Sequence, residues 1–276
     1  MSQVTISTFY HFAPIDAPES RKPDVLARMI ELGVKGTITL SPEGVNATIS
    51  GAKDALEGIK NYLRAWPGLE SLQDKISDYA RQPFGKSKVK VKRELISLGV
   101  EANPSICVGE YVPYDQWNAL ISRDDVITID TRNAYEYRIG HFDGAINPDT
   151  RGFKEMVAFT ETHLDPKTHP HVAMYCTGGI RCEKYSSYLL TQGFERVYHL
   201  HGGILEYLEH VPPENSLWIG DCFVFDERVA VGHGLVANPD ATMCLGCGNP
   251  LYSKDREQSG YIEGAQCHYC DGTPST

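Results

Sequence analysis

The amino-acid sequence predicts a mixed α/β protein built from three parts, because the apolar pattern differs from one part to the next. Residues 1–98 alternate strand-like and helix-like stretches, with two strands adjacent in the middle. Residues 99–216 place short apolar strands between helical stretches, which is typical of a parallel sheet. Residues 217–276 begin with one aromatic-rich stretch and continue as a glycine- and cysteine-rich segment with little periodicity.

The first part has the element order of a ferredoxin/acylphosphatase-like α+β domain. Apolar residues recur at helical spacing behind Pro23, and a proline suits the first turn of a helix. The turn-forming stretch SPEG, at 41–44, lies between two β-rich stretches and predicts a hairpin. The resulting order, β-α-β-β-α-β, is that of the ferredoxin-like motif. Its elements are expected at 4–12, 23–32, 37–40, 46–50, 55–66 and 86–95.

The central part is expected to carry the chemistry. Its strands are predicted at 125–130, 171–176 and 196–200, with helices between them. In parallel α/β sheets, functional groups gather where strands end and loops begin. The residues after position 175 are therefore the first place to look for a site.

Composition and charge exclude several classes of protein. Apolar residues make up 41% of the chain and charged residues 22%, which excludes a largely disordered or fibrous chain. No stretch approaches ~18 uninterrupted apolar residues, so no membrane span is expected. No signal peptide is visible at the N-terminus, and a cytoplasmic location is expected. The eight cysteines are then thiols, metal ligands or a nucleophile in a reducing compartment.

The formal net charge of −10 is distributed unevenly along the chain. It is +3 over residues 1–100, −7 over 101–210 and −6 over 211–276. Within the first segment, alternate residues of a predicted strand are cationic and share one face. This strip suits a nucleic-acid backbone, although lysines also protect edge strands from aggregation. Tyr79 and Phe84 are candidates for stacking on a base. The lysine strip comprises the four residues of this face and the arginine that follows them: Lys86, Lys88, Lys90, Lys92 and Arg93.

The segment HVAMYC-TGGI-RCEKYSSYLL contains the strongest candidate site. An apolar strand ends at Cys176, and a helix is predicted to start near Cys182. Backbone N–H groups and the positive end of a helix lower a cysteine pKa and stabilise a thiolate. The intervening residues Thr177, Gly178, Gly179 and Ile180 are expected to form an anion cradle, to which Arg181 adds a permanent charge. A buried structural cysteine is the alternative.

The spacing of this loop resembles that of the rhodanese family. Arg181 follows Cys176 by five positions, whereas cysteine-based phosphatases place arginine six positions later. The stretches IDTR, EYRIGHFDGAIN and LHGGILEYL look like further rhodanese signatures, in the same order along about a hundred residues. The resemblance implies a rhodanese-like parallel α/β domain whose loop cysteine carries a persulfide.

The whole chain resembles the rhodanese-type tRNA uridine hydroxylases. The likeness includes the small first domain, the loop CTGGIRCEK, the stretch GDCFVFDERVAV and the final pair of C-x-x-C motifs. It implies oxygen-dependent hydroxylation of the wobble uridine of tRNA to 5-hydroxyuridine, with molecular oxygen as co-substrate and contacts to the anticodon region.

The sequence leaves the origin of this oxygen chemistry open. We find no flavin, nicotinamide or haem motif. His141 and Asp143 have the spacing that begins a two-histidine, one-carboxylate iron site, but they lie inside a rhodanese signature. The simpler hypothesis is that Cys176 adds to C6 of the uracil and activates C5, with Arg181 stabilising the developing charge. Cys182 is either a resolving thiol or a small residue that starts the helix.

Residues around the loop are expected to support it. Asp130 and Arg132 end a parallel strand, and an arginine–carboxylate pair with Glu136 is expected to hold the adjacent loop. His141 is expected to fix a turn rather than act as a base. Lys184 either stabilises the site or lies on a solvated helix face.

Two other functions fit the loop. A sulfurtransferase would move sulfane sulfur from thiosulfate or from a protein persulfide. A non-enzymatic rhodanese fold would bind a partner, although such a module has no need of an activated thiol.

The last part of the chain has the spacing of a four-thiolate zinc site. Two C-x-x-C pairs are separated by nineteen residues, and a short tail with few core residues gains stability from a metal. Disulfides, an empty thiol cluster or a redox pair are the alternatives. Cys107, Cys222 and His268 are expected to have no part in it. The four ligands are Cys244, Cys247, Cys267 and Cys270.

Overall fold

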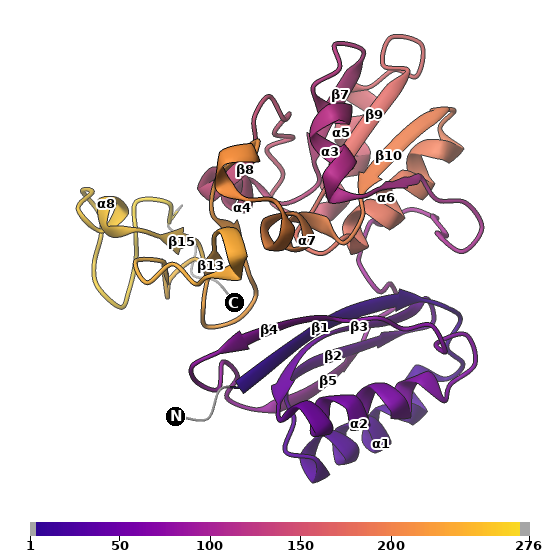
Figure 1. The fold of residues 1–276 in the computed structure, drawn as a ribbon, viewed down its shortest axis with the longest axis vertical. Coiled ribbons are helices and arrows are strands. Elements are labelled where there is room, and N and C mark those ends of the chain that lie inside the picture. The colour runs from indigo at the N-terminus through magenta and orange to yellow at the C-terminus, as the bar shows by residue number, and fades with distance from the viewer. Residues whose placement is uncertain (1–3, 271–276) are drawn as a thin grey trace. The chain divides into compact units, whose positions relative to one another are not determined.

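The computed structural model describes residues 4–270, and the chain divides into two compact units between Val108 and Gly109 (Figure 1). The predicted third part folds together with the second as one unit. No helix within residues 4–270 has the length and apolar character needed to cross a membrane.

The first unit is a five-stranded sheet with two helices on one face (Figure 1). The strands lie in the order β4-β1-β3-β2-β5. Apolar residues of α2 at helical spacing, among them Ile59 and Leu63, are fully buried against the sheet, which is why this stretch forms an amphipathic helix. The elements are β1 Val4–Phe12, α1 Pro18–Glu31, β2 Lys35–Ser41, β3 Gly44–Gly51, α2 Lys53–Arg64, β4 Lys75–Tyr79 and β5 Ser87–Val91.

The ferredoxin/acylphosphatase-like domain is present, but the predicted last strand is wrong in one respect. The strand that completes the expected motif beside β1 is β4, which pairs with it antiparallel. The lysine-rich strand β5 is an additional strand at the opposite edge, parallel to β2. The sequence analysis missed β4 because no residue of its sequence KISDY is buried, so the apolar alternation that signals a strand is weak.

The second unit contains the expected parallel sheet, with the order β6-β10-β9-β7. Its strands are β6 Glu110–Val112, β7 Val126–Asp130, β9 His171–Tyr175 and β10 Arg196–Leu200, and the short strand β8 Gly140–Phe142 lies outside the sheet. Its helices are α3 Tyr114–Ile121, α4 Ala134–Ile139, α5 Met156–His163, α6 Ile180–Thr191 and α7 Gly203–His210, with a 3-10 turn at Phe153–Glu155.

The remainder of the chain attaches to this sheet through aromatic packing. Strand β11 Trp218–Gly220 pairs antiparallel with β8. The Trp218 ring packs edge-to-face on Phe142, 5.1 Å between centroids, and Phe142 also contacts Tyr175 and Tyr207. Beyond it lie β12 Cys222–Phe223, β13 Ala230–Val231, β14 Thr242–Met243, β15 Pro250–Leu251 and α8 Ser253–Arg256, with 3-10 turns at Pro213–Asn215 and His233–Leu235.

Candidate functional site

The loop between β9 and α6 curls around the sulfur of Cys176. Gly179 adopts φ +104°, a left-handed conformation that favours glycine, and α6 begins immediately after it. This curl lets the Gly179 N–H donate to Cys176 Sγ at 3.1 Å. The helix therefore starts two residues earlier than the sequence analysis expected. The Cys176 side chain is almost fully buried.

The start of α7 holds the other side of the same loop. The Ile204 and Leu205 N–H groups donate to the carbonyl oxygens of Cys176 and Thr177, at 3.0 and 3.1 Å. A Cβ on Gly203 would lie 2.6 Å from each of those oxygens, so only glycine fits there. Because α7 takes up the two carbonyls, the loop can direct N–H groups toward the sulfur. The HGG stretch at the start of α7 therefore also supports the loop, a role that its sequence alone does not reveal.

The surroundings of Cys176 stabilise its thiolate. Burial alone would raise the pKa of the thiol, but it is outweighed by a hydrogen bond from the Cys182 side chain, the Arg181 guanidinium and two loop N–H groups. Together these lower the pKa of Cys176 to about 5. Burial and the neighbouring thiolate raise the pKa of Cys182 well above its usual range. Near neutral pH, the pair therefore consists of a thiolate and a thiol that donates to it.

Arg181 is fixed by a carboxylate from another helix. Its Nη1 and Nη2 atoms donate to Glu136 Oε2 and Oε1 at 2.7 and 2.8 Å, and both side chains are buried. Burial would raise the pKa of Glu136, but the charge and hydrogen bonds of Arg181 outweigh this effect. The pKa of Glu136 is therefore lower than usual. Glu136 also accepts from the Asn133 N–H at 3.1 Å, as part of a capping box at the start of α4. Arg181 is thus held in one orientation beside the sulfur.

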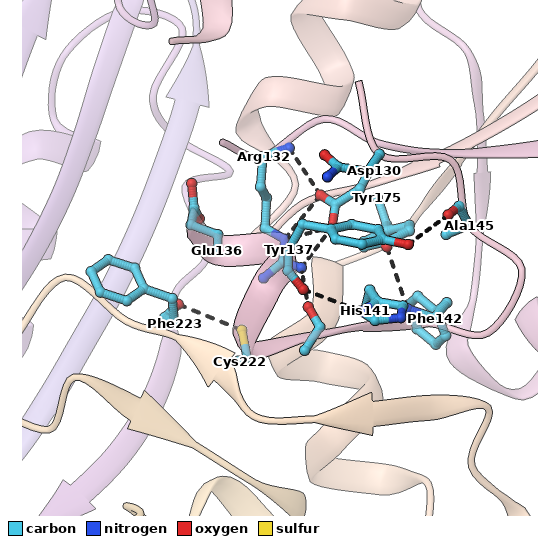
Figure 2. A network of polar contacts seen from close by, with 12 residues as sticks. Asp130, Arg132, Glu136, Tyr137, His141, Phe142, Ala145, Tyr175, Cys222 and Phe223 are labelled. Carbon is cyan, nitrogen blue, oxygen red and sulfur yellow. Dashed lines mark hydrogen bonds and ion pairs between the residues drawn. The ribbon is translucent and has the colours of Figure 1, made fainter. Parts of the chain in front are cut away.

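A second ion pair supports the end of β7 (Figure 2). The expected pair of Arg132 with Glu136 is wrong: Arg132 pairs with Asp130 through Nε and Nη2, at 2.9 and 2.6 Å. Arg132 Nη2 also donates to the Gly140 carbonyl at 2.5 Å, and its guanidinium lies over the Trp218 ring at 5.1 Å. All these groups are buried. Through Asp130, Gly140 and Trp218, the Arg132 side chain connects β7, β8 and β11. These contacts give the ion pair a structural role.

His141 joins this network through its contacts with Tyr137 (Figure 2). Its ring stacks on Tyr137 at 4.1 Å, and its Nδ1 lies 3.1 Å from the Tyr137 carbonyl. Within residues 4–270, His141 and Asp143 belong to no group of three potential metal ligands. Lys184 is fully buried rather than solvated, so the solvated-face alternative is wrong. Cys222 is also buried, and burial raises its pKa to about 12.

The four cysteines of the tail come together as a compact cluster. All four sulfurs lie within 4.8 Å of one another. The Cys244–Cys270 and Cys247–Cys267 pairs are each 3.7 Å apart, and the Cys267–Cys270 pair is 4.0 Å apart. Four sulfurs about 2.3 Å from a central zinc stand about 3.8 Å apart, whereas a disulfide needs about 2.05 Å. The cluster therefore fits a tetrahedral metal ion and excludes the disulfide alternative.

Local hydrogen bonds prepare these sulfurs to bind a cation. Burial raises the pKa of Cys244, but N–H groups of Cys247 and Gly246 and the neighbouring thiols lower it to about 7. The Cys267 N–H donates to Cys270 Sγ at 3.3 Å, and Asn249 Nδ2 donates to Cys247 Sγ at 3.1 Å. His268 is exposed and takes no part in the cluster. The sequence analysis missed Asn249, which has no spacing signature of its own.

The lysine strip has the geometry of an exposed edge. Lys86, Lys88, Lys90 and Lys92 are exposed, as is Arg93, whereas Val89 between them is buried. Tyr79 and Phe84 are half-buried. Because β5 is an edge strand, this geometry suits both a phosphate-binding strip and protection against edge pairing.

Two family models and a full-length relative match this chain. The family described as "UPF0176 acylphosphatase like domain" matches residues 4–95, and the rhodanese-like domain matches residues 114–210. A protein of Teredinibacter turnerae named "tRNA uridine(34) hydroxylase" is 45% identical over 271 residues, which is 98% of this chain and 84% of that protein.

Two solved structures resemble single domains. The rhodanese-like domain of an Anabaena protein superposes with a TM-score of 0.33 at 18% identity, over 40% of this chain and 78% of that domain. An acylphosphatase of Coxiella burnetii superposes with a TM-score of 0.24 at 13% identity, over 32% of this chain and 93% of that protein.

Proposed function

Because the chain belongs to the tRNA uridine(34) hydroxylase family, we propose that it converts the wobble uridine of tRNA to 5-hydroxyuridine, with Cys176 as the nucleophile. The observation that carries the role of Cys176 is the hydrogen-bonded, low-pKa thiolate at the end of β9. Such a thiolate is ionised near neutral pH, and the thiolate is the reactive form of cysteine.

In the proposed reaction, the Cys176 thiolate adds to C6 of the uracil and electron density moves to C5 and O4. Arg181 and the loop N–H groups stabilise the negative charge that develops. The C5 electron pair then forms a bond to molecular oxygen, and the resulting peroxide anion takes a proton from solvent to give a C5 hydroperoxide. Two equivalents of a thiol reduce this hydroperoxide to the C5 alcohol and water and are themselves oxidised to a disulfide. Loss of the C5 proton and departure of the Cys176 thiolate from C6 then restore the C5–C6 double bond.

The test of this role is a Cys176→Ser variant produced in cells that lack the natural protein. We expect tRNA nucleosides from these cells to contain no 5-hydroxyuridine, as measured by mass spectrometry. Cys107→Ser, outside the loop, is the matched control and should keep the product at the wild-type level. An undiminished product in Cys176→Ser would refute the mechanism. Absence of the product with wild-type protein would refute the function.

The second candidate is a sulfurtransferase, favoured by the same low-pKa thiolate, which can hold sulfane sulfur as a persulfide. Transfer from thiosulfate to cyanide, measured as thiocyanate, tests it. Thiocyanate formation that depends on Cys176, without 5-hydroxyuridine in tRNA, would favour this function over hydroxylation. If neither thiocyanate nor 5-hydroxyuridine forms, a non-enzymatic binding module is the function that remains.

The proposal extends to the metal, the RNA contacts and the location. The four cysteines of the tail would hold a structural zinc. The distances between their sulfur atoms fit tetrahedral coordination of this ion. The lysine strip on β5 would contact phosphates near the anticodon. A cytoplasmic location accords with thiols that function in the reduced state. Metal analysis of protein purified with and without chelator tests the zinc, and no metal in either sample would reject it.

A further inference from the structure

Helix α4 carries side chains that reach both the thiolate loop and the cysteine cluster. It is only six residues long. Glu136 binds Arg181 with two hydrogen bonds. Two residues further along, Arg138 contacts Asn249 and Tyr269, which lie beside the cysteine cluster of the tail. One short helix therefore touches both sites of the second unit.

Arg138 reaches the cluster through two separate contacts. Its Nη2 donates to Asn249 Oδ1, and Asn249 Nδ2 in turn donates to Cys247 Sγ at 3.1 Å. Its guanidinium also lies 4.0 Å from the centre of the Tyr269 ring. Tyr269 stands between the ligand candidates Cys267 and Cys270 in the sequence. Both C-x-x-C pairs are thus tied to the same arginine.

The chemistry of these contacts favours arginine at this position. Four thiolates around a divalent cation carry two net negative charges, and a nearby guanidinium offsets part of that charge. The planar guanidinium can also stack on Tyr269 while it donates to Asn249, which the compact ammonium group of lysine cannot reproduce. Arg138 also fixes the Asn249 amide so that its N–H₂ group faces the sulfur.

We propose that Arg138 is a positioning residue that couples the cysteine cluster to the thiolate loop. By holding Asn249 and Tyr269, it sets the position of α4, and α4 sets the position of Glu136 and therefore of Arg181. A formed cluster thus keeps the guanidinium beside Cys176. The coupling rests on Cys176 being the reactive thiol of the proposed function, and its effect is on that thiol rather than on RNA binding.

The test compares Arg138→Met with wild-type full-length protein. The readout is the pH midpoint of Cys176 alkylation by iodoacetamide, measured by mass spectrometry on the Cys176 peptide. We expect the midpoint to rise in Arg138→Met, with a ~3-fold slower reaction at pH 6, because a less firmly placed α4 holds Glu136 and Arg181 less firmly beside the sulfur. Arg138→Lys keeps the charge but not the stacked, planar contact, so it should resemble Arg138→Met. Arg196→Met, an exposed arginine on β10, removes the same charge elsewhere and should leave the midpoint unchanged.

A second readout follows the cluster itself. Zinc release to a chromogenic chelator should be faster in Arg138→Met and in Asn249→Ala than in the Arg196→Met control. Removal of the metal from wild-type protein should shift the Cys176 midpoint in the same direction as Arg138→Met. An unchanged midpoint in Arg138→Met would overturn the coupling, whatever the zinc release. Because alkylation needs neither tRNA nor oxygen, this result is independent of whether the protein hydroxylates uridine.

Discussion

Cys182 offers a direct test of what stabilises the Cys176 thiolate. The Cys182 thiol is fully buried and hydrogen-bonded to the Cys176 sulfur. The Cys182→Ala substitution removes this hydrogen-bond donor and changes the side-chain volume only slightly. Cys182→Ser keeps a donor, because a hydroxyl replaces the thiol. The two variants therefore separate hydrogen bonding from packing.

The size of the effect follows from the strength of one charge-assisted hydrogen bond. Such a bond contributes about 1.5–3 kcal/mol. Since one pKa unit corresponds to about 1.36 kcal/mol, its loss raises the pKa by about one to two units. The Cys176 pKa of about 5 would then rise in Cys182→Ala to about 6–7. At pH 6, the thiolate fraction would fall from about nine tenths to between one half and one tenth.

The assay is the rate of Cys176 alkylation by iodoacetamide between pH 4 and pH 9. The midpoint reports the pKa, while the plateau at high pH reports intrinsic nucleophilicity, which rises as the pKa rises. We expect the Cys182→Ala midpoint to lie at least one unit above that of wild type, and Cys182→Ser to lie between them. A Cys182→Ala midpoint equal to that of wild type would show that the Cys182 thiol does not stabilise the thiolate.

Three further outcomes test the framework around the loop and the strip on β5. Gly203→Ala should lower the melting temperature in calorimetry, because its Cβ would meet two carbonyl oxygens at 2.6 Å; Gly152→Ala, with open space around it, should not. Asp130→Asn should cost about 3–5 kcal/mol in urea unfolding, because it leaves the buried Arg132 unpaired. Asp125→Asn, in an exposed pair, should cost little, and equal losses in the two variants would contradict this assignment. Triple substitution of strip lysines by alanine should weaken tRNA binding and flatten its salt dependence, and unchanged binding would leave the strip only a role in edge protection. The lysines to replace are Lys86, Lys88 and Lys90.

Local spacing was sufficient to predict the parts of the structure that depend on near neighbours. The cysteine cluster follows from two C-x-x-C pairs, and the loop follows from a strand, a glycine pair and a helix. The start of α6 was placed too late, because the left-handed turn at Gly179 was not visible in the apolar pattern.

Long-range pairing was harder to predict. Glu136 and Arg132 are neighbours in the sequence, yet Glu136 binds Arg181, 45 positions away. Sequence proximity favoured the wrong pair because the choice between two arginines depends on where the end of β9 brings Arg181. In the same way, β4 was missed because a strand with no buried residue has no apolar signal.

The partnership of Arg181 and Glu136 also has an electrostatic consequence. The sequence suggests a cationic cradle, but in the fold the Arg181 charge is balanced by Glu136, and the thiolate adds a second negative charge. Among Arg181, Glu136 and Cys176, one positive charge thus faces two negative ones near neutral pH, and the Gly179 N–H is already bonded to the sulfur. We therefore expect a loop with this balance to bind an uncharged ring such as uracil more readily than a dianion such as thiosulfate. On this expectation, the Glu136 carboxylate that orients the arginine also selects against negatively charged substrates.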